Sequence, residues 1–290
     1  MSNELQDAPA FSPISNLPIS NDPINTEVFG ITPGVLEMMM IQSRQFPRDL
    51  EKVRDMSLFE LSIVPDLAAR SYYSIPYNQG KKNETRVEGP SIKAAMTLCR
   101  NWRWALNGEC QAGEDKSAAY INGMFFDVQM GTYTMRTWRV PKFYKPSGGQ
   151  GLIPKNSDLF QTHIQAGKSK AVRNAILASL PDWLVHVYFD RAKEIVLNPP
   201  KNTLPATQSI QERILIGQQA IMKAFGVTPE EMKTYIAENA EAFEDDGQFL
   251  VHLQGIYNSL KDGHVRVDEM FNRADAAKSG PAMPMAKEGA

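Results

Sequence analysis

Apolar residues recur every three or four positions along much of the chain, the spacing of helices with one buried side. Helix-start signals accompany this spacing. Thr32-Pro33 supplies an N-cap and a first-turn proline, and Ser91 follows a Gly-Pro break as the next cap. The sequence therefore predicts a mainly helical chain, with helices over 32–46, 46–64, 91–104, 157–180 and 183–197, and three short ones after residue 228.

Strand patterns are fewer. Two runs of aromatic and β-branched residues, 117–130 and 132–144, meet at Met130-Gly131 and predict a β-hairpin that ends at Pro141. The tyrosine-rich segment 70–77 predicts one further strand, followed by a polar turn. The expected fold class is therefore α+β, in which a small antiparallel sheet (the hairpin plus one strand) packs against long helices, with a small helical module at the C-terminus.

Proline-rich polar segments suggest how the chain is divided. We expect a flexible N-terminal arm over 1–30, an α+β core over 31–197, a linker over 198–207, the helical module over 208–276 and a disordered tail over 277–290.

Composition adds two expectations about location. No run of about 18 apolar residues indicates a membrane span, and the N-terminus lacks the basic and apolar regions of a secretory signal. Cys99 and Cys110 are the only cysteines, too few for a disulfide framework or a zinc site of known spacing. A reducing cytoplasm is the expected compartment.

Charge is unevenly distributed, although the net charge of the 290 residues is only −2. Residues 70–200 contain 18 Lys/Arg against 10 Asp/Glu, whereas both flanking regions have an excess of acidic residues. A basic middle segment between acidic ends is typical of a chain that meets a polyanion, and a balanced surface also produces it by chance.

The tripeptide Gly167-Lys168-Ser169 matches the end of a nucleotide-binding phosphate loop. Such a loop needs a glycine five positions earlier, where this chain has Thr162, and a buried strand upstream, where the pattern is helical. We therefore expect a helix here rather than an NTPase site.

On that helix, Lys170, Arg173 and Asn174 share one side with His163, while Phe160, Ile164, Ala171 and Ala175 pack inward. The basic side is either a solvated helix surface or a row of phosphate contacts. Interleaved cations and aromatic rings elsewhere favour the second reading, because single-stranded nucleic acid needs charges for phosphates and rings for bases. These additional candidates are Arg100, Arg103, Arg136, Trp138, Arg139 and Lys142, of which Arg136 and Trp138 share a strand face that Arg139 does not.

Catalytic motifs are weak in this sequence. The four histidines form no metal-binding motif with a cysteine, and Ser91 lies in Gly-Pro-Ser rather than in a nucleophile elbow. We therefore expect neither an enzyme nor a bound cofactor or metal.

Three segments carry a resemblance to a known group of proteins. "SYYSIPY…RVEGPSIKAAMTLCRNW", "SDLFQTHIQAGKSKAVRNAILASLPDWLV" and "FGVTPEEMKTYI…LQGIYNSLKDGHVRVDEMF" are similar to segments of phage single-strand annealing recombinases of the RecT, Red-beta and Erf types. The similarity covers about residues 45 to 275. The sequence departs from the group's pattern at Trp102-Arg103-Trp104, where a turn with Gly or Asn is expected.

The resemblance implies a core that binds single-stranded DNA and assembles into rings or filaments, and that pairs complementary strands without ATP. By position, Lys168, Lys170 and Arg173 match the group's DNA-facing helix. It also implies a bacterial host cytoplasm and a partner such as a phage exonuclease or a host single-strand-binding protein. The acidic stretch 237–246 is a candidate contact for such a partner, and equally a solvated acidic helix.

Other classes of protein remain open at this stage. The chain is alternatively a single-strand-binding protein that protects DNA without annealing it, a metal-dependent nuclease, which the missing carboxylate cluster disfavours, or an oligomeric phage structural or adaptor protein.

Overall fold

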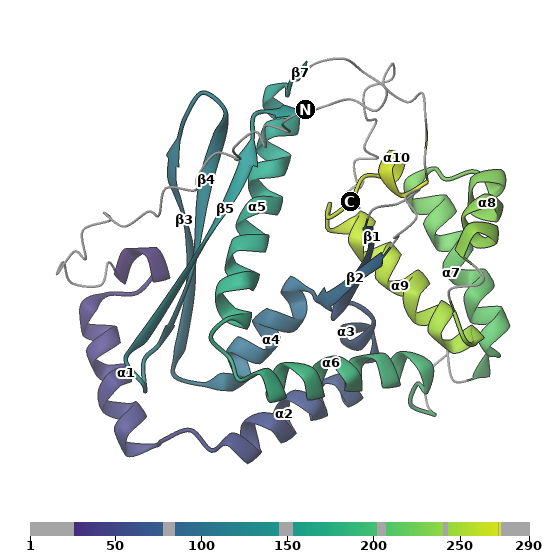
Figure 1. The fold of residues 1–290 in the computed structure, drawn as a ribbon. Coiled ribbons are helices and arrows are strands. Elements are labelled where there is room, and N and C mark those ends of the chain that lie inside the picture. The colour runs from purple at the N-terminus through teal and green to yellow at the C-terminus, as the bar shows by residue number, and fades with distance from the viewer. Residues whose placement is uncertain are drawn as a thin grey trace, which may run out of the picture.

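The computed structural model describes residues 26–77, 85–144, 153–201, 207–239, 243–271 and 273 (Figure 1). The helices are η1 (Thr26–Phe29, a 3-10 turn), α1 (Pro33–Gln45), α2 (Leu50–Ile63), α3 (Pro65–Ala69), α4 (Ile92–Trp102), α5 (Ser157–Leu177), α6 (Asp182–Leu197), α7 (Ile210–Phe225), α8 (Pro229–Asn239), α9 (Asp246–Lys261) and α10 (Val267–Met270). The strands are β1 (Tyr72–Tyr77), β2 (Thr85–Pro90), β3 (Ala105–Glu114), β4 (Ala118–Asp127), β5 (Thr132–Pro141), β6 (Phe143–Tyr144) and β7 (Ile153–Pro154).

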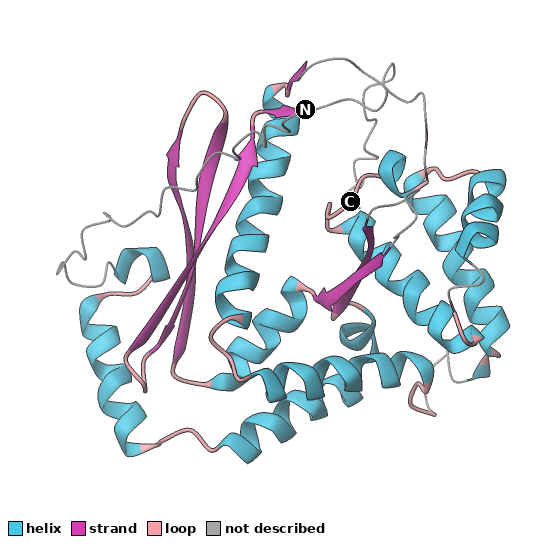
Figure 2. Cartoon of the chain, viewed as in Figure 1, coloured by secondary structure: helices cyan, strands magenta, loops and turns pink. Residues whose placement is uncertain are grey.

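The fold is α+β, as the sequence predicts, and its largest sheet is antiparallel with the order β3-β4-β5 (Figure 2). The β4–β5 hairpin turns at residues 128–131, where Gly131 has a φ of 65°, a conformation that residues with a Cβ rarely adopt. Pairing of Ile121 with Trp138 and of Gly123 with Arg136 places these residues on one face of the sheet. Helix α5 crosses that face (Figure 1).

Glycines let α5 lie very close to the sheet. A Cβ at Gly123 would come within 2.0 Å of the Ala171 carbonyl carbon, and one at Gly167 within 2.6 Å of Val140 Cγ2. Ile164 and Ala171 are buried in this contact, as expected for the inward side of the helix. The small residues of α5 therefore serve packing rather than phosphate binding.

Helices α2, α3, α4 and α6 form the base of the molecule and share the main hydrophobic core with the lower part of α5 (Figure 1). Fully buried Leu61, Leu98, Leu184 and Tyr188 fill that core. Helix α4 begins where the sequence predicts, because Ser91 Oγ accepts hydrogen bonds from the Lys93 and Ala94 amides.

The C-terminal module docks on the core through β1 and α9. Ser259 Oγ donates to the Ser74 carbonyl at 2.8 Å, and Asn258 Nδ2 donates to the Tyr72 carbonyl at 2.7 Å. His252 lies between Ser74 Oγ (2.9 Å) and the Tyr235 hydroxyl (2.8 Å). We call this set of contacts the β1–α9 seam. Since buried polar groups are costly when unpaired, the seam fixes the position of α9 on β1.

Several expectations about local structure were wrong. Strand β1 pairs with β2 in a separate ribbon rather than joining the hairpin's sheet, and β2 and β3 were not predicted as strands. Helix α5 begins at Ser157, and Asn156 caps it, because its side chain accepts from the Leu159 amide. The predicted turn covers 78–85, of which Thr85 is the first residue of β2 and 78–84 lie outside the described residues. Most of the N-terminal arm, much of the linker and the C-terminal tail also lie outside the described residues.

Among the described residues, no helix combines the length and apolar character needed to cross a membrane.

We predict that Gly123→Ala destabilises the protein by about 3 kcal/mol, because the new methyl group would overlap the α5 backbone and force the helix off the sheet. The measurement is the free energy of unfolding from urea denaturation. Gly113→Ala in the same sheet is the matched control, since nothing lies within 4 Å of a Cβ there. Equal stabilities of the two variants would contradict the close contact.

Candidate nucleic-acid interface

The β1–α9 seam brings the turn after α9 beside the basic side of α5, although the two segments are far apart in sequence. The Arg173 guanidinium carbon lies 4.9 Å from the centre of the Tyr73 ring. The Tyr73 ring in turn lies 5.0 Å from the His264 ring, centre to centre. Tyr73 belongs to β1 and His264 to the turn, so three separate segments meet at this position.

Arg173 is buried, with only 8% of its surface exposed. Its Nε and Nη2 donate to Asn174 Oδ1, both at 3.2 Å. Its Nη1 has no hydrogen-bond partner among the described residues. Burial lowers the pKa of Arg173, while Tyr73 and Asp262 act in the opposite direction. A buried guanidinium with a free N–H is costly for the protein unless something else accepts from it.

Lys170 lies one turn before Arg173, with its Nζ 5.3 Å from the Trp138 ring centre. Burial and then the charge of Arg173 lower the pKa of Lys170, and Glu269 of α10 opposes them. Burial and the charge of Arg173 thus disfavour the positively charged form of Lys170, and a bound anion would stabilise that form.

Two histidines in this region are held in the neutral form. Burial, followed by the charges of Lys170 and Arg173, lowers the pKa of His264 to about 3. Burial and the charges of Lys155, Lys170 and Arg266 lower the pKa of His163 to about 4. His264 Nε2 is buried and has no hydrogen-bond partner in the described part of the chain.

Together these side chains form one basic site between α5 and the C-terminal module. Lys155 contributes through its Nζ, which lies 2.6 Å from His163 Nδ1, and Arg266 pairs with Asp268 at 2.8 Å. The remaining nearby carboxyl groups are Asp262 and Glu269. We call this set the α5 cationic cluster, defined as Lys155, His163, Lys170, Arg173, His264 and Arg266.

Lys168 does not belong to this cluster. Its Nζ forms an ion pair with Glu109 Oε1 of β3 at 3.0 Å, on the side of α5 that faces the sheet. Gly167-Lys168-Ser169 lies in the middle of α5, as the sequence predicts, so it does not form a phosphate loop. The three cations expected on one DNA-facing side are thus divided between two surfaces.

The hairpin residues that were expected to contact DNA also lie on two different faces of the sheet. Arg136 and Trp138 lie on the face of the sheet that α5 covers, and Arg139 on the opposite face, as the alternation along a strand predicts. Arg139 is exposed and its Nη2 donates to Ser117 Oγ at 3.2 Å. Lys142 pairs with Glu114 at 2.5 Å. Trp138 is the hairpin residue that lies beside the cluster.

Arg100 and Arg103 lie at the end of α4, outside the cluster. Arg100 pairs with Glu60 of α2 at 2.5 Å. Arg103 has a φ of 56° and its guanidinium carbon lies 5.6 Å from the Trp104 ring. Trp102 belongs to the core, where its Nε1 donates to Asp127 at 2.8 Å.

The sequence did not indicate Tyr73, Lys155, His264 or Arg266 as site residues. Lys155 could have been found, because it precedes the basic helix closely and adds to the same local excess of charge. No sequence signal connects Tyr73 or His264 to that helix, since only the docking of α9 on β1 brings them there.

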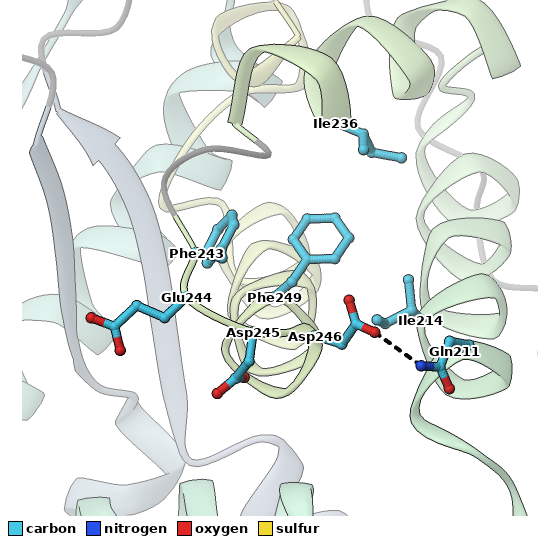
Figure 3. A pocket seen from close by; sticks show the side chains of 8 residues that line it. All are labelled: Gln211, Ile214, Ile236, Phe243, Glu244, Asp245, Asp246 and Phe249. Atoms are coloured by element: carbon cyan, nitrogen blue, oxygen red, sulfur yellow. Dashed lines mark hydrogen bonds between the residues drawn. The ribbon is translucent and has the colours of Figure 1, made fainter.

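A hollow lies within the C-terminal module, between α7, α8 and the start of α9, with a volume of about 420 Å³ (Figure 3). Its acidic rim belongs to the stretch 237–246. Asp245 caps α9 by accepting from the Gln248 amide, and Asp246 accepts from Gln211 at 2.9 Å. Asp245 and Asp246 therefore stabilise the local structure of the module. The residues that line the hollow are Gln211, Ile214, Ile236, Phe243, Glu244, Asp245, Asp246 and Phe249.

Comparison with known proteins finds no matching family model, no similar curated protein and no similar solved structure. Within the described ranges, no group of three or more His, Cys, Asp or Glu side chains is placed to hold a metal ion.

We predict that Arg103→Gly stabilises the protein by about 1 kcal/mol. The backbone of Arg103, with φ 56° and ψ 158°, is in a region that glycine adopts and residues with a Cβ avoid. Its carbonyl, which accepts from Arg48, is kept in the variant. Urea denaturation measures the change, and Arg103→Ala, which keeps the Cβ, is the control. If Arg103→Gly is no more stable than Arg103→Ala, the result contradicts backbone strain at Arg103.

We predict that the free protein loses stability as the pH falls from about 7 to about 5.5, before the carboxylates begin to titrate. His264 binds a proton in the unfolded chain near its ordinary pKa of 6.5 but not in the folded protein, where its pKa is about 3. Lowering the pH therefore favours the unfolded state. His264→Gln should reduce this loss by roughly 1 kcal/mol at the lower pH, as measured by urea denaturation at both pH values.

Proposed function

We propose that this protein binds single-stranded DNA through the α5 cationic cluster and pairs it with a complementary strand without ATP. The observation that carries the proposal is the burial of two neighbouring cations, Lys170 and Arg173, together with an Arg173 Nη1 that has no hydrogen-bond partner in the described chain. A row of backbone phosphates would supply the missing negative charge and accept from the free N–H groups.

The composition of the cluster favours backbone recognition over sequence recognition. Its donors are cationic groups, which contact phosphates of any sequence. Aromatic rings lie beside two of the cations, Trp138 beside Lys170 and Tyr73 beside Arg173. A strand held by its phosphates keeps its base edges available, and a second strand then tests its register by base pairing.

The exposed apolar side chains of α1 and its C-cap support self-association, which the resemblance also implies. Within the described part of the chain, Ser43 is the buried residue of α1, while Met38, Ile41 and Phe46 are 50%, 52% and 62% exposed. Isolated helices of this length are marginal in water. Figure 1 shows α1 on the side of the sheet opposite α5. We propose that these apolar side chains pack on another copy of the chain, and that the assembly works in the bacterial host cytoplasm.

The proposal that the chain has a partner, a nuclease or a single-strand-binding protein, rests on the resemblance alone. The carboxylates of 237–246 that cap α9 and bind Gln211 favour the reading of this stretch as local structure.

We predict that Lys170→Gln/Arg173→Gln weakens binding of single-stranded DNA at least tenfold at moderate salt, because two phosphate contacts are removed. The slope of log Kd against log salt should fall by about 1 to 1.5, since each contact on a single strand contributes about 0.7. Fluorescence anisotropy of a labelled oligonucleotide across a salt series measures both quantities.

The matched control is Lys168→Gln/Lys193→Gln, which changes the net charge equally but removes cations that are paired with Glu109 and Glu88. This variant should keep the slope of the wild type. An annealing assay with complementary oligonucleotides then separates annealing from mere protection of the strand. Absence of binding by the wild type at low salt would overturn the proposal and favour the structural or adaptor protein.

A further inference from the structure

The centre of the α5 cationic cluster is a set of three side chains around Tyr73. Arg173 and Lys170 come from α5, and His264 comes from the turn after α9. Two nitrogens in this set, Arg173 Nη1 and His264 Nε2, are buried without a hydrogen-bond partner in the described chain. Arg173 Nη1 can only donate, so an acceptor is missing at that atom. His264 Nε2 becomes a second donor when the imidazole is protonated.

The groups that surround this centre do not balance its charge. Asp262 in the turn interacts with Arg173, but it also interacts with Lys93 of α4 and Lys261 of α9. Glu269 of α10 interacts with Lys170. Neither carboxylate has a hydrogen bond to Arg173 or His264 in the described chain. Burial first, and then the charges of Lys170 and Arg173, lower the pKa of His264 and keep its ring unprotonated.

The positions of these groups are rigidly determined. His264 follows α9 within a few residues, and its amide donates to the Ser259 carbonyl at 2.8 Å. Ser259 and Asn258 are themselves held on β1 by the seam. This support limits the movement of His264 relative to α5 and so reduces the cost of ordering the site. Because the two orphaned nitrogens are buried, a phosphate has to open the site to reach them.

We infer that Arg173, Lys170 and His264 form a site for one backbone phosphate of single-stranded DNA, and that filling it adds a proton to the His264 imidazole. This inference rests on the proposed function and adds a regulation to it: DNA binding tightens as the pH falls.

The physical reason is that a phosphate reverses the local field. In the free protein burial, and then the charges of Lys170 and Arg173, disfavour a proton on His264. A phosphate between them offsets both charges and accepts a charge-assisted hydrogen bond from the imidazolium. The affinity of His264 for its proton then rises, and by linkage a lower pH favours the DNA-bound state. The phosphodiester carries its charge throughout this range, so the proton is taken up by the protein.

The test is the dissociation constant of a labelled oligothymidylate, measured between about pH 8 and about pH 5.5 at constant ionic strength. Thymine is used because it does not bind a proton in this range. The wild type should bind about three- to tenfold more tightly at the acid end. His264→Gln should lose most of this gain, whereas His186→Gln, an exposed histidine on α6, should keep it. His163 contributes equally to all three proteins, so the difference belongs to His264.

The outcomes are distinguishable. If the wild type and His264→Gln bind DNA with the same pH dependence, the inference is overturned and the proposed function stands. If no protein binds at any pH and at low salt, both fail. NMR titration of the His264 ring in the wild type, with and without saturating oligothymidylate, gives an answer that does not depend on the variant. A rise of its pKa on binding supports the inference, and an unchanged pKa overturns it.

Discussion

The contact between β1 and α9 determines where the C-terminal part of the candidate site lies relative to α5. Gly255 of α9 packs so closely on β1 that a Cβ would come within 2.7 Å of Ser74 Cβ. Buried hydrogen bonds from Asn258, Ser259 and His252 reach β1 at this point. Because these polar groups would be costly if left unpaired, the C-terminal module has one favourable position on the core. That position places the turn with His264 against α5.

The candidate cations of the described chain differ in how their charge is balanced. Lys168, Lys142 and Arg100 each pair with a carboxylate of the same chain, so their charges are balanced within the fold. Lys170 and Arg173 are more deeply buried and lie beside each other and beside two neutral histidines. Burial of like charges is unfavourable for stability alone. Its occurrence at a junction of three segments supports the proposal that a polyanion binds this surface rather than the hairpin.

Self-association would extend this surface. Helix α1 exposes its apolar side chains on the side of the sheet away from the cluster, so packing of another copy there leaves the cluster accessible. Repeated copies would present repeated phosphate sites along one strand, and a strand held at many points gains affinity without any new type of contact.

The sequence by itself determined the local structure that depends on near neighbours. Thr32-Pro33 and Ser91 begin helices, Gly131 turns the hairpin, and Gly167-Lys168-Ser169 lies within a helix because no strand or earlier glycine supports a loop. It did not reveal β3, since the segment 105–114 contains two glycines and becomes a strand only by pairing with β4. Nor did it separate Lys168 from Lys170, or join His264 to Arg173. Those outcomes depend on which surfaces α5 meets, and long-range packing, not helical spacing, decides that.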